Sequence, residues 1–169
     1  MNYYHLGRIT YSKMAAEETR DESDTLVAKP SLEEVARSIK KGERSVMAYW
    51  NLLSGEVPNC KKLIKEHNLK IIGTHRVYIR MAAGCYSRTK LDVVYSHPNA
   101  LIQCSDYLSR YPNIKQIPVE STEKGIEIIK KIKHGMALGM KEAFDGLEIL
   151  TEDAANSKEN YTDFFIVEK

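Results

Sequence analysis

The residues that lead into the last strand-like segment of the chain, "ENYTDFFIVEK", have side chains that could do chemistry. Asn160, Thr162 and Asp163 supply an amide, a hydroxyl and a carboxylate immediately before an alternating run over residues 164–167. A terminal strand that ended in solvent would need none of these groups. Their presence raises the question of what this entry to the strand faces.

Further polar side chains occur at the expected junctions between strands and helices. Ligands of open α/β sheets bind at the carboxyl ends of strands, where helix N-termini present free N–H groups. "YSHPNA" and "VEST" are two such junctions, and Ser96, Ser121 and Thr122 are candidates to orient a small polar anion. Ser and Thr are also favoured N-caps, so the alternative is that these residues only begin helices.

His97 is the least generic residue of these junctions. Pro98 suits the first position of a helix, which would hold the imidazole of His97 at the edge of the loop. The alternative is a histidine that caps the helix or packs locally.

The elements that must position these groups alternate between strands and helices along most of the chain. "SLEEVARSIKKGE" predicts a helix with Ser31 as N-cap, Glu34 completing a capping box and Gly42 as the stop. "RSVMAYW" and "KIIGTHRVYIRMAAGC" have strand patterns. The order predicts an α/β protein with a mostly parallel sheet. If there are two lobes, the chain crosses between them at "IIGTHRVYIR" and "NYTDFFIV".

Composition excludes several classes of function. The net charge of +2 gives no electrostatic case for nucleic acid or an anionic membrane, and no apolar run is long enough to span a bilayer. The start lacks the pattern of a secretory signal, so we expect a cytosolic protein. Cys60, Cys85 and Cys104 have no CxxC spacing, and the five histidines lack metal-ligand spacing. We therefore expect no metal and no other cofactor.

Four motifs occur in the order and spacing of prephenate dehydratase catalytic domains: "VYSHPNALIQCSDYL", "ESTEKGIEIIKK", "GMALGMKEAFDGLEIL" and "NYTDFFIVEK". That family typically has V-x-SHPQAL-x-QC, ST-x-x-A, GL-x-IL and N-x-TRF, and its opening GP-x-GTYS resembles "GRITYS" here. The similarity extends over essentially the whole chain. It implies a two-lobe α/β fold like that of periplasmic binding proteins (type II), with lobe 1 at 1–75 plus 160–169 and lobe 2 at 76–159. It also implies a homodimer, and no following regulatory domain is expected.

The resemblance carries site residues over to matching positions of this sequence. Thr162 is the implied catalytic, proton-handling residue. The implied ligand-binding residues are Arg8, Thr10, Ser12, Trp50, Asn51, Ser96, His97, Ser121, Thr122, Asn160, Asp163 and Phe164.

The chain departs from the family pattern in its Gly-Pro opening, at Asn99, which replaces the usual glutamine, and at three positions that bear on the chemistry of the site. Asp163 replaces the arginine of TRF, and Trp50 and Leu52 replace the glutamate and serine of P-I-E-N-S, in which Asn51 survives. Prephenate carries two carboxylates, and its conversion to phenylpyruvate expels the ring hydroxyl and carbon dioxide together. We take the side-chain charge to lie about 5 Å from a ligand carboxylate, with an effective dielectric near 20. Exchanging arginine for a carboxylate would then weaken binding of a dianion by roughly 6 kcal/mol, or about four decades in affinity.

Three resolutions are open. Asp163 is protonated or turned away, Arg8 supplies the missing cation, or the ligand lacks one carboxylate of prephenate. Trp50 and Leu52 favour a different ligand in a drier cleft, unless Trp50 is simply core. We expect Asp163 to face either a ligand or Arg8.

The main functional hypothesis is a prephenate dehydratase-like lyase that acts on prephenate or a related cyclohexadienyl or aryl acid, with altered chemistry. The alternatives are a non-catalytic small-molecule-binding or accessory protein of the same fold, an ordinary prephenate dehydratase, and a prephenate decarboxylase.

Overall fold

The computed structural model describes residues 1–8 and 10–169. The chain divides into two compact units, which we call unit 1 (Met1–Ile79 with Glu159–Lys169) and unit 2 (Arg80–Lys158). Each unit has its own sheet and its own helices, and each is described by itself.

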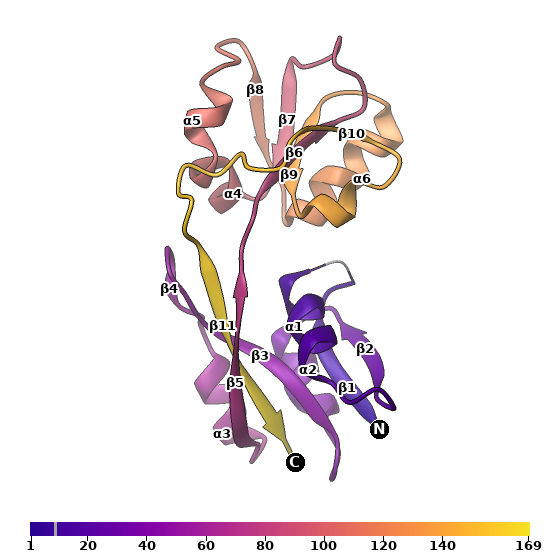
Figure 1. Ribbon diagram of the computed structural model, residues 1–169, viewed down its shortest axis with the longest axis vertical. Coiled ribbons are helices and arrows are strands. Elements are labelled where there is room, and N and C mark those ends of the chain that lie inside the picture. Colours follow the sequence, from indigo (N-terminus) through magenta and orange to yellow (C-terminus); the bar gives the residue numbers. More distant parts are fainter. Residues whose placement is uncertain (9) are drawn as a thin grey trace. The chain divides into compact units, whose positions relative to one another are not determined.

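The sheet of unit 1 has the strand order β2-β1-β3-β11-β5, with a short β4 paired to β3 (Figure 1). Its strands are β1 (Asn2–Leu6), β2 (Thr25–Lys29), β3 (Arg44–Asn51), β4 (Gly55–Glu56), β5 (Lys70–Tyr78) and β11 (Tyr161–Glu168). β1 runs parallel to β2 and β3, whereas β11 runs antiparallel to both β3 and β5. The end of the chain is therefore an interior strand of this sheet.

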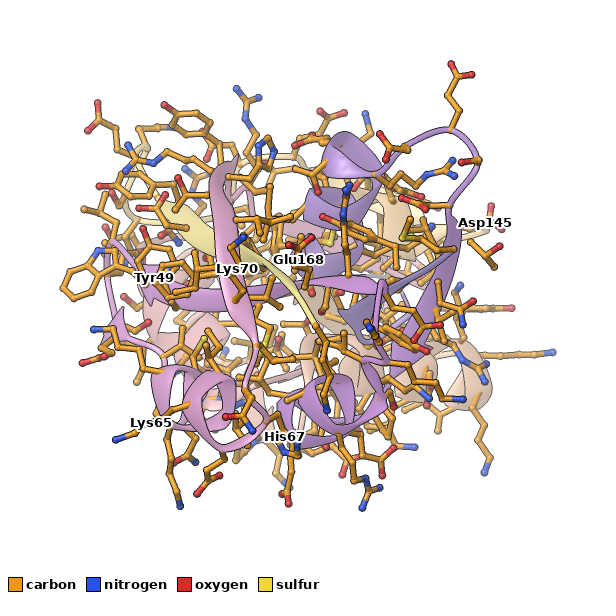
Figure 2. The ribbon with its side chains drawn as sticks, turned by 90° about the horizontal axis from the view of Figure 1, so that it is seen from below. Tyr49, Lys65, His67, Lys70, Asp145 and Glu168 are labelled. Carbon is orange, nitrogen blue, oxygen red and sulfur yellow. The ribbon has the colours of Figure 1, made fainter. Side chains whose placement is uncertain are left out.

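Helices cover both faces of this sheet. They are α1 (Tyr11–Thr19), α2 (Leu32–Ser38) and α3 (Cys60–Glu66). Neighbouring residues of a strand point to opposite faces, so Tyr3 packs with α1 residues and Tyr4 packs with α2 and α3 residues. Figure 2 shows α2 and α3 side by side on one face. The predicted N-cap of α2 is confirmed, because Ser31 Oγ accepts from the N–H of Glu34 at 3.1 Å.

The sheet of unit 2 has the order β10-β6-β9-β7-β8. Its elements are β6 (Ala82–Cys85), β7 (Val93–Ser96), α4 (Pro98–Gln103), α5 (Ser105–Leu108), β8 (Lys115–Pro118), α6 (Thr122–Ile132), β9 (Met136–Gly139), the 3-10 helix η1 (Lys141–Phe144) and β10 (Glu148–Thr151). Helices α4 and α5 pack on one face, around Leu101 and Leu108. The side chains of Ile126 and Ile129 on α6 pack on the other face, with Phe144.

The α/β class is confirmed, but the expectation of mostly parallel sheets is wrong. β7 is parallel to β8 and β9, while β6 and β10 are antiparallel, so both sheets are mixed. Residues 70–85, which have a strand pattern in the sequence, form two strands, β5 and β6, that belong to different units. Helices α4 and α5 are separated at Cys104, whose backbone leaves the helical region at φ −112° and ψ 18°.

Candidate functional site

Three of the predicted residues in unit 1 share one hydrogen-bond network. Thr162, near the start of β11, lies opposite Asn51 at the end of β3. The Nδ2 amide of Asn51 donates to Thr162 Oγ1, to Asn160 Oδ1 and to the carbonyl of Tyr161, each at 3.0 Å. Pairing of β3 with β11 thus brings together an amide, a hydroxyl and a second amide from opposite ends of the sequence.

The oxygen of the Asn51 amide fixes the turn that follows β3. Its Oδ1 accepts from the backbone N–H groups of Leu53 and Ser54, both at 3.0 Å. Because Oδ1 must face these two N–H groups, the side-chain amide of Asn51 has one orientation, in which Nδ2 points at Thr162. Because Thr162 Oγ1 accepts that hydrogen bond, its own hydrogen is directed elsewhere and can be donated to a ligand oxygen.

Thr10 and Ser12 hold the segment that joins β1 to α1. Thr10 is the N-cap of α1: its Oγ1 accepts from the N–H of Lys13 at 3.2 Å and donates to the carbonyl of Leu6. Ser12 Oγ accepts from the N–H of Leu6 at 3.0 Å. Both hydroxyls therefore serve the loop itself, and their contribution to a ligand stays a prediction.

Asp163 has a cation as its partner, but the cation is not Arg8. Arg76 on β5 forms a two-pronged ion pair with it, with Nε 2.7 Å from Oδ1 and Nη2 3.0 Å from Oδ2. The same guanidinium lies 3.6 Å from the centre of the Tyr161 ring. The Asp163 carboxylate raises the pKa of the Arg76 guanidinium. The candidate role of Arg8 as the compensating cation is therefore wrong, and Arg8 is exposed in the loop after β1.

Asp163 and Thr162 point to opposite faces of the sheet. Thr162 shares its face with Val77, its neighbour on β5, and with Phe164, both buried in the core beside α1. Asp163 lies on the other face with its neighbours Arg76 and Trp50. The expectation that Asp163 faces a ligand beside Thr162 is therefore wrong. The carboxylate is paired with Arg76 on the neighbouring strand and points to the face of the sheet opposite Thr162.

Two further predicted residues differ from expectation in their burial. Trp50 is 42% exposed, so the alternative that it belongs to the core is wrong. Phe164 is only 2% exposed and packs with Val46 and Val77, so its side chain serves the core of unit 1 and not a ligand.

In unit 2, His97 begins α4 at the carboxyl end of β7. Its Nδ1 accepts from the N–H of Asn99 at 3.2 Å, and Pro98 takes the first helical position. Because Nδ1 is an acceptor, the neutral imidazole carries its proton on Nε2, which is free to donate. The capping that the sequence offered as an alternative is thus observed, and it also fixes the tautomer. Ser96 is fully buried and donates to the carbonyl of Leu138, so it holds β7 to β9.

Ser121 and Thr122 begin α6, which follows β8. Ser121 is the N-cap, and its Oγ accepts from the N–H of Lys124 at 3.0 Å. β7 and β8 are parallel neighbours, so the helix starts that follow them lie at the same edge of the sheet. His97, Ser121 and Thr122 are all half-buried at this edge. The sheet of unit 2 therefore presents an imidazole N–H, a threonine hydroxyl and the free N–H groups of α6 on one side.

Arg76 is the residue that the sequence did not reveal. Its strand is visible in the alternation of Val77 and Ile79, but the sequence does not say that β11 lies between β3 and β5. The available signal was the carboxylate at position 163, which required a cation on a neighbouring strand.

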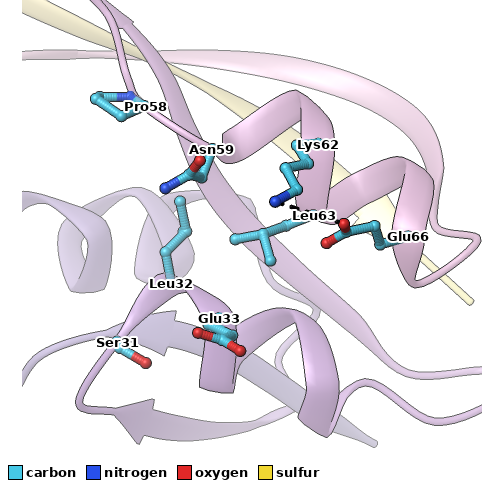
Figure 3. Close-up of a pocket in the computed structure, with 8 residues that line it drawn as sticks. All are labelled: Ser31, Leu32, Glu33, Pro58, Asn59, Lys62, Leu63 and Glu66. Atoms are coloured by element: carbon cyan, nitrogen blue, oxygen red, sulfur yellow. Dashed lines mark ion pairs between the residues drawn. The ribbon is translucent and has the colours of Figure 1, made fainter.

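Other groups in the described residues offer less chemistry. A surface hollow of about 340 Å³ between α2 and α3 contains none of the predicted site residues (Figure 3). Cys60, Cys85 and Cys104 are buried, and burial raises the pKa of each thiol, to about 11 for Cys60 and about 12 for Cys104. Across residues 1–8 and 10–169 no group of three acidic, His or Cys side chains could hold a metal.

The two-unit α/β architecture defines a class of proteins with known members. It is similar to a prephenate dehydratase from Arthrobacter aurescens in complex with L-Phe (TM-score 0.86, 18% identity, all of this chain and 60% of that chain). It is also similar to GqqA, described as a quorum quenching acylase (TM-score 0.84, 20% identity, all of this chain and 64% of that chain). A substrate-binding domain of a putative molybdenum ABC transporter from Clostridium difficile is more distant (TM-score 0.52, 9% identity, 98% of this chain and 84% of that chain). These likenesses show the fold, and they confirm the expected resemblance to substrate-binding proteins.

Residues 4–169 match the prephenate dehydratase family, and the chain belongs to that family. A prephenate dehydratase from Methanocaldococcus jannaschii is 29% identical over 175 residues, covering 98% of this chain and 64% of the relative. The bifunctional chorismate mutase/prephenate dehydratase of Buchnera aphidicola is 29% identical over 150 residues, covering 82% of this chain and 38% of the relative. The chain thus spans about two fifths to two thirds of the length of these relatives. No helix among the described residues is both long and apolar enough to cross a membrane.

Proposed function

We propose that this chain is a lyase of the prephenate dehydratase type, which removes water and carbon dioxide from prephenate or a closely related cyclohexadienyl acid. The observation that carries the proposal is the Asn51–Thr162–Asn160 network, because it leaves the Thr162 hydroxyl oriented and with a hydrogen to donate. Family membership supports the class of reaction.

In the proposed reaction, the bond between the ring carbon and its carboxylate breaks as the ring becomes aromatic. The electron pair of that bond enters the ring, carbon dioxide leaves, and the hydroxyl at the opposite ring position departs with its bonding pair. Negative charge develops on that departing oxygen, which must gain a proton to leave as water. A hydrogen bond from Thr162 stabilises this charge where it forms.

The reversal of charge at position 163 no longer argues against a dianionic substrate. The penalty of roughly 6 kcal/mol applies to a free carboxylate beside the ligand. Asp163 is instead only 14% exposed and neutralised by Arg76 on the face of the sheet opposite Thr162. Of the hypotheses raised by the sequence, ordinary dehydration therefore gains support over altered chemistry.

Incubation with prephenate, followed by ultraviolet detection of phenylpyruvate, tests the proposal. Thr162→Ala should lower kcat by about 100- to 1000-fold, the usual loss when one donor to a developing oxyanion is removed. Thr162→Ser keeps a hydroxyl and should retain more activity. Thr74→Ala, an exposed change on β5 of the same sheet, is the matched control and should be neutral.

Two other outcomes would redirect the proposal. Release of carbon dioxide without an aromatic product would indicate a decarboxylase. Saturable binding of prephenate without turnover would indicate a non-catalytic binding protein, and either result contradicts the dehydratase.

We also infer a cytosolic homodimer. Three buried, unpaired cysteines suit a reducing compartment, and the family resemblance implies the dimer. Light scattering during gel filtration measures the mass in solution, and a monomer would contradict the inference.

A further inference from the structure

The position of Asp163 in the sheet connects two departures from the family pattern. Because β11 lies between β3 and β5, Asp163 has one direct neighbour on each flank, Trp50 on β3 and Arg76 on β5. All three side chains lie on the same face of the sheet. In the family pattern, the positions of Trp50 and Asp163 carry glutamate and arginine, so a relative with the register of this chain would have an acid and a guanidinium directly opposite each other on paired strands.

We propose that the Arg76–Asp163 pair takes the place of that cross-strand pair, and that its task is to position Thr162. In this chain the residue at position 163 is acidic where the family pattern has a base, and it pairs with Arg76 on β5. The motif arginine and its replacement are then positioning residues, which contact neither substrate nor reacting atoms. The inference rests on the proposed function only where it uses activity as a readout.

Contacts on both sides of Thr162 explain how the pair would position it. Asp163, the next residue, is held by two hydrogen bonds from the planar guanidinium of Arg76. Tyr161, the preceding residue, has its ring 3.6 Å from the same guanidinium, and its carbonyl accepts from Asn51. One side chain on β5 thus fixes both neighbours of Thr162, because a two-pronged pair restricts orientation as well as distance.

Loss of the charge requirement at position 50 explains the tryptophan there. With Asp163 paired on the other flank, position 50 no longer needs a carboxylate, and Trp50 lies exposed, with its ring near Gly55 on the facing strand β4. Nothing in the structure explains Leu52.

Variants that break and rebuild the pair test the inference. Arg76→Gln and Asp163→Asn remove one partner each, and Asp163→Arg places two guanidinium groups against each other. The double variant Asp163→Arg/Arg76→Asp restores a pair between the same strands with reversed polarity. The triple variant Asp163→Arg/Trp50→Glu/Arg76→Gln rebuilds the family arrangement on β3, where the neighbouring Glu56 is already paired with Lys61.

Two readouts are needed. The side-chain amide signals of Asn51 in a proton–nitrogen correlation spectrum report its bond to Thr162 without any substrate, and kcat and KM with prephenate report the consequence. The three single variants should shift or broaden the Asn51 signals and lower kcat by about 10- to 100-fold with KM unchanged, as expected for misplacement of a reacting group. The double and triple variants should recover both readouts. Arg88→Gln, which removes a comparable exposed guanidinium–carboxylate pair with Glu148 in unit 2, is the matched control.

Each outcome decides the inference. It is overturned if folded single variants keep the native Asn51 signals, or if the folded double variant fails to recover them. The Asn51 signals could change in the single variants and recover in the double and triple variants while neither the native chain nor any variant converts prephenate. In that case the positioning role stands and the proposed function fails. If the single variants are unfolded by circular dichroism, recovery of fold and signals in the double variant supports the inference, and its absence overturns it.

Discussion

The imidazole of His5 lies on β1 on the face covered by α1, with only 3% of its surface exposed. Within the described part of the chain its Nδ1 is the one buried side-chain nitrogen or oxygen without a hydrogen-bond partner. Burial lowers the pKa of His5, and the charge of Lys13 on α1 acts in the same direction, while Glu17 opposes it. Burial in the folded protein therefore disfavours the charged form of His5.

The folded state should lose stability in mild acid through this residue. The pKa of His5 is lower in the folded than in the unfolded chain, so between these two values the unfolded state binds more protons. The free energy of unfolding should then fall as the pH drops below the unfolded value near 6.5, with a slope of at most about 1.4 kcal/mol per pH unit for one proton. Urea denaturation of His5→Phe at several pH values should show a flatter profile than the native chain.

A suitable control is His67→Gln, because His67 lies at the end of α3 away from this core. It should keep the pH profile of the native chain. An unchanged profile in His5→Phe would mean that other groups cause the acid sensitivity.

Candidate site residues could be identified from the sequence where they belong to a motif with fixed spacing. Contacts between strands could not be predicted in this way. Asn51 and Thr162 were identified from motifs, and the structure joins them by a hydrogen bond. The partner of Asp163 required the strand order, because Arg76 is 87 residues away in the chain. Local alternation gives the face of a residue relative to its own neighbours, and only the register tells which residue of another strand shares that face.

At the scale of elements, the contact between α6 and β7 is tighter than the sequence suggests. Gly125 occupies the position where the family pattern ST-x-x-A has alanine, and a Cβ atom there would lie 2.3 Å from the carbonyl oxygen of Tyr95. The start of α6, with its N-cap Ser121, was predictable from cap chemistry. Its distance from the sheet was not, because close packing depends on which residues of β7 lie underneath.

Gly125→Ala should destabilise the protein even though it restores the family residue. Alanine gains about 1 kcal/mol over glycine in helix propensity, whereas forcing an extra methyl into a packed contact costs typically 1–3 kcal/mol. The clash involves backbone, so α6 must move away from β7. Urea denaturation should show a net loss of about 1 kcal/mol. Gly73→Ala is the control, because the nearest atom to its Cβ would be the flexible end of Ile166 at 3.4 Å, an ordinary van der Waals contact. Equal or higher stability of Gly125→Ala would contradict the close contact.

At the scale of the whole molecule, the order of the chain explains why the sheet of unit 1 is mixed. The chain forms β1 to β5 of that sheet, continues through all of unit 2, and returns as β11 between β3 and β5. The motifs predicted a two-unit protein. Pairing of the last strand with β3 and β5 at once is a contact of high sequence separation, which periodicity cannot show.

Unit 1 should depend on β11, whereas unit 2 should fold without it. Phe164 and Val167 on β11 are fully buried in different core clusters, and each such side chain contributes roughly 1.5–3 kcal/mol. Together they supply a large part of the roughly 5–15 kcal/mol that stabilises a typical domain. A fragment of residues 1–79 should therefore be unfolded by circular dichroism, while a fragment of residues 80–158, continuous in sequence and with its own core, should be folded.

Joining the two pieces of unit 1 should restore it. The N–H of Ile79 donates to the carbonyl of Asn160 at 2.8 Å, so the end of β5 lies beside the start of β11 in an antiparallel pair. A two-residue Asn-Gly turn, the usual connection for such a hairpin, can link residue 79 directly to residue 160. The linked protein should fold cooperatively and show dispersed amide signals, including those of Asn51. The linked protein with Phe164→Ala is the control, and its free energy of unfolding should be lower by roughly 3–5 kcal/mol. A folded 1–79 fragment, or an unfolded linked protein, would show that β11 is not the strand on which unit 1 depends.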